Sequence, residues 1–198
     1  MLRVALTGGI ATGKSYVLSR LRERDIPCID ADDVVHDAMA SGTPVAQEIA
    51  AQFGPAFLNS DGSVNRTLLG EKVFGDSGSR LRLEAIIHPV VYQTIHRWYD
   101  ALEHPFGVAS IPLLYETHRE GDFDFVAATV CSPEQQLERV VRRDRVSDHN
   151  ARQRLAAQMP AEEKAQRSNF AIRTGGTTLD TDRQVEELLA ALHKIRKG

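Results

Sequence analysis

A glycine-rich segment near the start of the chain can bind phosphate groups. Residues 8–15 satisfy the pattern G-x-x-x-x-G-K-[ST] at every fixed position. In this pattern the glycines let backbone N–H groups turn towards a polyphosphate, Lys14 brings a positive charge to the β- and γ-phosphates, and the Ser15 hydroxyl can ligate Mg²⁺. The predicted phosphate-binding residues are Gly8, Gly9, Ile10, Ala11, Thr12, Gly13, Lys14 and Ser15, followed by Tyr16.

Two apolar patterns flank this segment. Residues 2–6 form a short apolar run, as expected of a buried strand, and Val17, Leu18 and Leu21 recur at helical spacing within residues 14–24. The order strand, loop and helix is the context that the phosphate-binding pattern requires. We therefore expect an α/β fold whose first strand leads directly into the binding loop.

Acidic residues follow the second apolar run. Residues 26–29 predict a strand, and Asp30, Asp32 and Asp33 come directly after it, before a helical pattern that starts at Val34. Open parallel sheets bind ligands outside the carboxyl ends of their strands, so these carboxylates are expected at the ligand-binding edge. One of them can cap the following helix. Capping does not require all three, so we expect at least one to have a functional role.

Helical patterns dominate residues 32–104. The dipeptide His88-Pro89 is predicted to interrupt them, because proline disfavours the helical conformation in the residue before it. The insert is longer than a crossover between parallel strands requires. The insert is a candidate to form one side of the binding site for a second substrate. Helices with a purely structural role would give the same pattern.

The third predicted strand, residues 106–111, ends in a segment of mixed character. Pro112, Leu113 and Leu114 bring apolar side chains to the same ligand-binding edge, and Glu116 adds a carboxylate. The two leucines are expected to lie partly in the core. An acid just past a strand is costly unless it is solvated or paired, so Glu116 is a candidate functional residue.

Arginines gather on a helix predicted to begin at Ser132, after a fourth strand at residues 125–130. Arg139, Arg142 and Arg143 project from one side of it, because three or four residues separate Arg139 from the other two. Guanidinium groups suit phosphate oxygens, and such a helix can close over a phosphoryl group in transfer. A solvated basic face paired with nearby acids would give the same pattern.

The remaining segment predicts a lid and the end of the core. Residues 148–167 are polar, rich in arginine and poor in large apolar side chains, which fits a mobile lid better than a core element. Residues 170–172 predict a fifth strand, and Val185, Leu188 and Leu192 mark a final amphipathic helix.

Composition limits the range of partners. The 198 residues, 42% of them hydrophobic, suffice for one globular domain, and the formal net charge of −3 gives no general attraction to nucleic acid or to membranes. Cys28 and Cys131 each end an apolar run, so neither a disulfide nor a metal site is expected. We find no signal or membrane-spanning pattern and expect a cytoplasmic protein, with a monomer favoured.

Taken in order, several segments of the chain resemble the dephospho-coenzyme A kinase family, and the resemblance extends nearly from end to end. The matching segments are residues 6–15 and 29–32, Asp61-Gly62 with Arg66, Leu83-Glu84 with His88-Pro89, residues 111–116, and Gln136-Leu137 with Arg139 and Arg143-Asp144. Many enzymes share a phosphate-binding loop, whereas the other segments in this order are far more specific. The chain departs from the family at Tyr16, where threonine is usual, at Ser168-Asn169, where Ala-Asp is usual, and at residues 173–176, where an Asp-Asn-Ser/Asn-Gly run is usual.

The resemblance implies an α/β fold of the P-loop NTPase type, with a five-stranded parallel sheet flanked by helices, a helical substrate-binding insert and an arginine-rich helical lid. The whole chain, residues 1–198, would then be one P-loop kinase domain. Its core would comprise about residues 1–31, 105–135 and 168–198, its substrate-binding part residues 32–104, and its lid residues 136–167.

The implied reaction is phosphorylation of the ribose 3′-hydroxyl of dephospho-coenzyme A by MgATP, which yields coenzyme A and ADP as the last step of coenzyme A biosynthesis. Lys14 would hold the phosphates and Ser15 the magnesium ion. Asp32 would accept the hydroxyl proton or bind magnesium through water, and Asp30 and Glu116 are alternative bases.

Further roles follow from the same resemblance. Arg139 and Arg143 would neutralise charge on the transferring group, and His88 would either position the substrate or cap a helix. The predicted substrate-binding residues are Asp30, Asp32, His88, Pro112, Leu113, Leu114 and Glu116.

Two other classes of protein fit part of the pattern. A P-loop kinase that phosphorylates a hydroxyl group of another small molecule or nucleotide would share the loop and the lid. Only His88-Pro89 and the segment at residues 112–116 argue against this class. A regulatory GTPase-like module would carry an N-K-x-D run after a late strand, and the sequence lacks that run.

Overall fold

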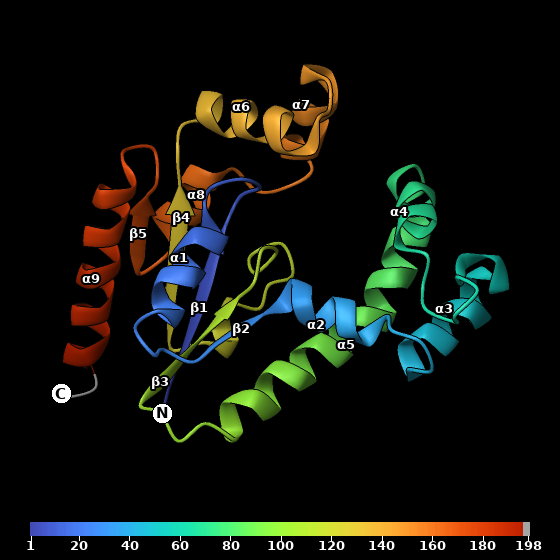
Figure 1. Ribbon diagram of the computed structural model, residues 1–198, viewed down its shortest axis with the longest axis horizontal. Helices are drawn as coiled ribbons and strands as arrows, with labels where there is room; N and C mark the ends of the chain where they lie inside the picture. Colours follow the sequence, from blue (N-terminus) through green and yellow to red (C-terminus); the bar gives the residue numbers. More distant parts are fainter. Residues whose placement is uncertain (196–198) are drawn as a thin grey trace. The chain divides into compact units, whose positions relative to one another are not determined.

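The computed structural model describes residues 1–195 and, within them, every side chain except that of Phe74. The last residues of the predicted core segment, 196–198, lie outside this range. Contacts divide the chain into two compact units, here called the sheet unit (Met1–Ile29 with Leu102–Gly198) and the helical unit (Asp30–Ala101). The elements of both units are labelled in Figure 1.

A five-stranded sheet organises the sheet unit. Its order is β2-β3-β1-β4-β5, so β1 lies in the centre. β1 pairs in parallel with β3 and β4, with Val4 opposite Val108 on one side and Phe125 on the other. This confirms the predicted parallel sheet. The strands are β1 (Leu2–Gly8), β2 (Cys28–Asp30), β3 (Phe106–Ser110), β4 (Phe125–Val130) and β5 (Phe170–Arg173).

Helices cover both faces of this sheet. Successive residues of a strand point to opposite faces, and Ala127 of β4 packs in the cluster that contains the leucines of α1 and α9. Ala128 packs instead with Ala161 and Ala165 of α8. The last part of the predicted lid, α8, therefore covers the face opposite α1 and α9. The helices of this unit are α1 (Lys14–Arg22), α6 (Pro133–Asp144), α7 (Asp148–Ala156), α8 (Ala161–Arg167) and α9 (Thr178–Ile195), with a short 3₁₀ turn η2 (Glu120–Asp122).

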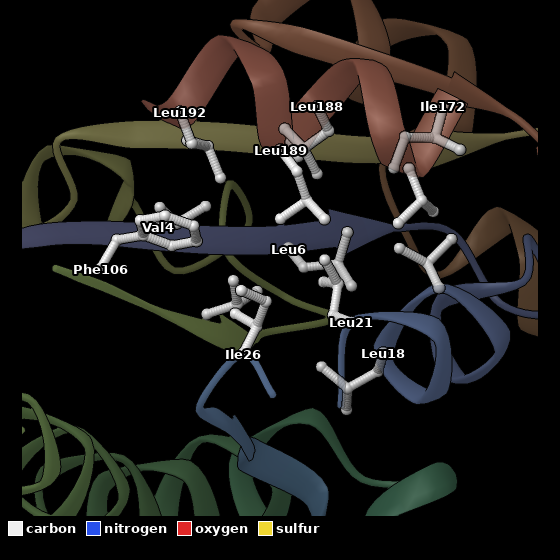
Figure 2. Close-up of a cluster of buried hydrophobic side chains, with 14 of the residues drawn as sticks. Val4, Leu6, Leu18, Leu21, Ile26, Phe106, Ile172, Leu188, Leu189 and Leu192 are labelled. Carbon is white, nitrogen blue, oxygen red and sulfur yellow. The ribbon is translucent and has the colours of Figure 1, made fainter. Parts of the chain in front are cut away.

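The main core cluster holds the central strand in place. Figure 2 shows Val4 and Leu6 of β1 among Leu18 and Leu21 of α1 and Leu188 of α9. All of these side chains are essentially inaccessible to solvent. Full burial of one such side chain contributes roughly 1.5–3 kcal/mol. The cluster thus fixes β1 and α1, which are the two elements that flank the glycine-rich loop.

The helical unit is built around one long helix, α5. Ile87, Val91 and Ile95 lie buried along α5, and α2, α3 and α4 each contact it. The helices are α2 (Ala31–Ala38), α3 (Pro44–Phe53), α4 (Arg66–Phe74) and α5 (Ser77–Asp100), with a 3₁₀ turn η1 (Pro55–Phe57).

The predicted break at His88-Pro89 is wrong, because α5 continues through Pro89. Proline removes one helical N–H donor. Buried side chains at Ile87 and Val91, on either side of it, hold both halves of the helix against the unit's core. Although α5 has 24 residues, neither it nor any other helix within residues 1–195 is apolar enough over a sufficient length to cross a membrane.

Candidate active site

The glycine-rich loop leaves the carboxyl end of the central strand and ends where α1 begins. Gly13 and Ala11 have positive φ values of 90° and 58°, which turn the backbone sharply before Lys14. Gly8 also has a positive φ, and a Cβ added there would lie 2.3 Å from Thr129 Oγ1. No larger residue fits at Gly8 without displacing β4. The loop thus has the tight geometry that its sequence pattern predicts.

Lys14 is folded over this loop. Its Nζ donates to Gly8 O at 2.9 Å and to Gly9 O at 3.0 Å. Ser15 is exposed in the first turn of α1, where helix N–H groups and the helix dipole favour anions. Donors from the backbone, from Lys14 and from the N-terminus of α1 therefore converge on one place, as binding of a polyphosphate requires.

Threonine hydroxyl groups brace the loop from behind. The Thr12 hydroxyl donates to Gly9 O at 2.8 Å, and its Oγ1 lies 2.7 Å from Thr129 Oγ1 of β4. Thr174, just after β5, donates from its hydroxyl to Thr12 O at 2.7 Å. All three threonines are buried. The loop is thereby fixed to two strands other than the one from which it emerges.

The first turns of α6 hold both the loop and the segment that follows β5. Gln136 Nε2 donates to Ile10 O at 2.7 Å, and Gln135 Nε2 donates to Gly175 O at 2.8 Å. Arg139, on the same helix, donates to Thr174 O at 2.7 Å. The Ser132 cap with Pro133 and Gln135 starts α6 as its sequence predicts, and this start sets the direction of the three side chains.

A cavity of about 270 Å³ lies beside the loop. Tyr16 borders it, and its hydroxyl donates to Asp182 Oδ1 at 2.8 Å. This hydrogen bond raises the pKa of Tyr16. The cavity is lined by Ala11, Gly13, Tyr16, Arg139, Thr174, Gly176, Thr177, Thr178 and Thr181.

The two arginines predicted to act in catalysis have different surroundings. Arg139 is half-buried and contacts Thr174 beside the cavity. Arg143 is 59% exposed and donates to Asp144 Oδ1 at 2.7 Å, and this carboxylate raises the pKa of Arg143. Arg154 of α7 contacts the same aspartate at 2.9 Å. The structure therefore brings Arg139 to the loop and pairs Arg143 within the lid.

The predicted residues after β3 lie in a turn on the sheet unit. Leu114 is fully buried and belongs to the packing, whereas Pro112 and Leu113 are half-buried. The Pro112 carbonyl and the Glu116 carboxylate both contact Lys164 of α8. Glu116 is thus a paired carboxylate, one of the two states expected for an acid in this position.

Three predicted residues belong to the helical unit. Asp30 caps α2, where its Oδ1 accepts from Asp32 N at 3.0 Å, as expected for one of the acids. The Asp32 side chain is exposed in the first turn of α2. His88 lies inside α5 with its ring edge to face against Tyr92, at a centroid distance of 6.3 Å. It therefore does not cap a helix.

Sequence reasoning assigned no role to Gln136, Thr174 or Lys164. Gln136 stands out in the sequence only as part of a segment that resembles the dephospho-coenzyme A kinase family, and Thr174 belongs to a predicted glycine turn. Lys164 lay in a polar stretch that resembled a lid. Their roles depend on contacts with residues more than 40 positions away, which local patterns do not reveal.

The described residues contain no group of three or more His, Cys, Asp or Glu side chains that could hold a metal ion by itself. The candidate ligand near the loop is the exposed Ser15 hydroxyl, because the threonine hydroxyls there are buried and bonded to other groups. A single protein ligand suits a magnesium ion that keeps waters and shares the oxygens of a bound phosphate, because Mg²⁺ is commonly held by few protein ligands in phosphate sites.

Known proteins are similar to this chain over most of its length. The family model for dephospho-CoA kinase matches residues 2–180. A dephospho-CoA kinase of Thermosynechococcus vestitus is 40% identical to the chain over 100% of it and 98% of the relative. Another, of Anaeromyxobacter dehalogenans, is 41% identical over 96% of the chain and 91% of the relative.

Solved structures agree with the sequence comparison. The chain is similar to the Thermus thermophilus protein TT1252 (TM-score 0.82, 30% identity, 96% of this chain and 97% of that one). It is also similar to dephospho-CoA kinase from Campylobacter jejuni (TM-score 0.73, 25% identity, 97% of each chain). A shikimate kinase from Acinetobacter baumannii shares the fold alone (TM-score 0.56, 15% identity, 98% of this chain and 94% of that one). On these matches, and on the phosphate-binding loop described above, the chain belongs to the dephospho-CoA kinase family.

Proposed function

We propose that this protein phosphorylates the ribose 3′-hydroxyl of dephospho-coenzyme A with MgATP and releases coenzyme A and ADP. The observation that carries the proposal is the family match over residues 2–180, on a chain whose loop places Lys14 over the end of the central strand. Because the sequence has no signal or membrane-spanning pattern, we expect the enzyme to act in the cytoplasm, with a monomer favoured over an oligomer.

The donor half of the proposed site belongs to the sheet unit. Lys14 and the loop N–H groups would hold the β- and γ-phosphates of ATP, and the Ser15 hydroxyl would ligate Mg²⁺. A bound magnesium ion supplies positive charge that stabilises the phosphates during transfer. In the structure Lys14 donates to the carbonyl oxygens of Gly8 and Gly9, and these hydrogen bonds hold its ammonium group over the loop that would bind the phosphates.

The 270 Å³ cavity is proposed to receive the adenine base of ATP. Its lining combines the planar guanidinium of Arg139 with the ring of Tyr16, and both groups stack well on flat aromatic ligands. Hydroxyl and backbone groups of residues 174–178 supply polar contacts. Thr174 and the two glycines after it take the place of the run that is usual in the family.

The acceptor half of the proposal rests on carboxylates of the helical unit. Asp32 would orient the 3′-hydroxyl and accept its proton, with Asp30 as the alternative base and a water-mediated magnesium contact as a second role for Asp32. Asp30 already accepts a hydrogen bond from Asp32 N, which supports Asp32 as the one that reacts.

Other side chains are proposed to bind the substrate or the transferring group. Arg139 and Arg143 would neutralise charge on the transferring phosphoryl group. His88, Pro112, Leu113 and Leu114 would line the substrate side.

The test is a measurement of ADP release from MgATP with different acceptors. Dephospho-coenzyme A is expected to stimulate turnover far above the background of ATP hydrolysis. Adenosine, shikimate and nucleoside monophosphates serve as matched acceptors, since each offers a hydroxyl or phosphate to a P-loop kinase. Turnover that is not stimulated by dephospho-coenzyme A, or that is stimulated more by another acceptor, contradicts the proposal.

A further inference from the structure

A buried lysine in α8 connects the lid region to the segment after β3. The side chain of Lys164 has 0% exposure, and its Nζ lies 2.8 Å from Glu116 Oε1 and 3.0 Å from Glu116 Oε2. The same ammonium group donates to Pro112 O at 2.7 Å. The hydrogen bonds to Glu116 Oε2 and Pro112 O hold this ammonium group in place, and Glu116 Oε1 adds an ion-pair contact.

Glu116 is held from a second direction. Its Oε1 also accepts from Met159 N at 2.9 Å, in the connection between α7 and α8. One carboxylate thus joins the turn after β3, the connection and α8. Burial lowers the pKa of Lys164, and the hydrogen bond and charge of Glu116 act against that shift. Removing one partner from such a pair leaves the other charge uncompensated, which is strongly destabilising.

A second contact reinforces the first, one turn further along α8. The Arg167 guanidinium carbon lies 4.4 Å from the centre of the Tyr115 ring, and Arg167 also contacts Glu120 at 2.6 Å. Two cations of one short helix therefore hold one turn segment. Residues 112–118 have a turn conformation, and their backbone hydrogen bonds, such as those to Leu113 O and Leu114 O, are those of turns.

The segment borders the phosphate-binding loop. Pro112 O, which accepts from Lys164, also lies 3.4 Å from the hydroxyl of Thr7, the residue directly before Gly8. Ile111 N donates to Leu6 O at 2.8 Å. A shift of the Pro112 carbonyl would therefore be transmitted to the end of β1. Misplacement of reacting groups by about 1 Å is enough to cost about a hundredfold in rate.

We propose that Lys164 is a positioning residue of the kinase reaction, which holds residues 112–116 in place through Glu116 and Pro112. This inference rests on the proposed function, and it assigns Glu116 to the support of the site instead of to proton transfer. The bond between Lys164 and Glu116 aligns the carboxyl end of β3 beside the loop. It also fixes α8 against the turn that follows β3.

Kinetics of the full-length chain test the positioning role. Lys164→Met and Glu116→Gln are compared with Lys194→Met, which removes an exposed lysine of α9. We expect kcat to fall about a hundredfold in Lys164→Met and about tenfold in Glu116→Gln, while the KM for ATP changes less than about threefold. Lys194→Met should match the parent protein. The double variant Lys164→Met/Glu116→Gln removes both charges, so it should fold even where Lys164→Met does not, and its kcat should stay low.

Hydrogen exchange provides a measurement that does not depend on activity. The amide N–H groups of Thr117, His118 and Arg119 donate to backbone carbonyl oxygens within residues 112–116, so their exchange reports on the order of that segment. Their exchange should accelerate about tenfold or more in Glu116→Gln and in the double variant. Unchanged exchange there, or kcat within about threefold of the parent in both of these variants, overturns the inference. A parent protein that is inactive with dephospho-coenzyme A contradicts the proposed function instead, and the exchange rates then still decide whether Lys164 anchors the segment.

Discussion

Thr12 Oγ1 lies 2.7 Å from Thr129 Oγ1, in a fully buried contact between the phosphate-binding loop and β4. Thr129 Oγ1 also lies 3.3 Å from Thr7 O, at the end of β1. The two hydroxyl oxygens leave no space beside Gly8, because a Cβ atom at Gly8 would overlap both of them. The conformation of the loop is therefore set by a neighbouring strand as well as by its own glycines.

Gly8→Ala is expected to abolish activity. A Cβ at this position would lie 2.3 Å from Thr129 Oγ1 and 2.7 Å from Thr12 Oγ1, so the loop or β4 must move. We expect kcat/KM to fall at least about a hundredfold and the melting temperature to drop. Gly70→Ala in α4 is the matched control, because no atom lies within 4 Å of a Cβ added there. That change should leave activity unaltered and stabilise the protein by about 0.5–1 kcal/mol. An active Gly8→Ala protein would show that the loop tolerates another conformation.

Gln136→Ala is expected to weaken ATP binding. It removes the hydrogen bond from Gln136 Nε2 to Ile10 O and leaves that part of the loop without its contact to α6. Loss of about 1–1.5 kcal/mol corresponds to a rise of about five- to tenfold in the ATP dissociation constant. Titration calorimetry with an ATP analogue measures this change. Gln153→Ala, an exposed position on α7, should bind as the parent does. Equal affinities for the two variants would exclude this role of Gln136.

Asp32→Asn is expected to lower kcat by about a hundredfold or more, because a general base contributes roughly that much. ATP affinity should change by less than about threefold. Asp33→Asn is a close control, since both acids are exposed in the first turn of α2 and interact similarly with the helix dipole. Near-normal turnover of Asp32→Asn would move the role of base to Asp30, for which Asp30→Asn is the next measurement.

Both cysteine thiols are expected to react slowly in the folded protein. Burial raises the pKa of Cys28 to about 12, and Arg22 opposes this only weakly. Burial also raises the pKa of Cys131, against the effects of Arg139 and Thr174. At about pH 8 only about one Cys28 side chain in ten thousand would be a thiolate. Reaction with a disulfide reagent should be slow until guanidinium chloride unfolds the chain, and then reach two thiols. Fast reaction of the native protein would contradict the raised pKa of the two thiols.

The sequence predicts most of the sheet unit because its signals are local. Alternation of apolar runs and helical spacing located all five strands, and the loop motif specified Lys14 and Ser15. Local rules failed where packing decides the outcome. The residue before Pro89 was expected to leave the helix, but buried neighbours on both sides keep it helical.

The contacts around the loop could not be predicted for a related reason. A glutamine at position 136 and a threonine at position 174 have no special local pattern, and their partners lie far away in sequence. Lys164 lies in a polar segment whose composition predicts a solvated lid. It is nevertheless fully buried, and Glu116 compensates its charge. Which distant residues meet and compensate each other's charge depends on the topology of the fold. The spacing of apolar residues along the sequence does not specify that topology.

The central place of β1 also has a consequence for biosynthesis. β1 pairs with β3 and β4, so Leu2 faces Phe106 and Val4 faces Phe125. The ribosome therefore completes β1 long before either neighbour exists, and the strand leaves the exit tunnel with both edges unpaired and its apolar residues uncovered. Folding that waits for distant partners is slow and prone to aggregation. The proposed nucleotide cavity is complete only after the residues that follow β5 have emerged, because Thr174, Gly176 and Thr177 line it. Until β3 and β4 have emerged, β1 is an extended apolar segment of the kind that chaperones bind.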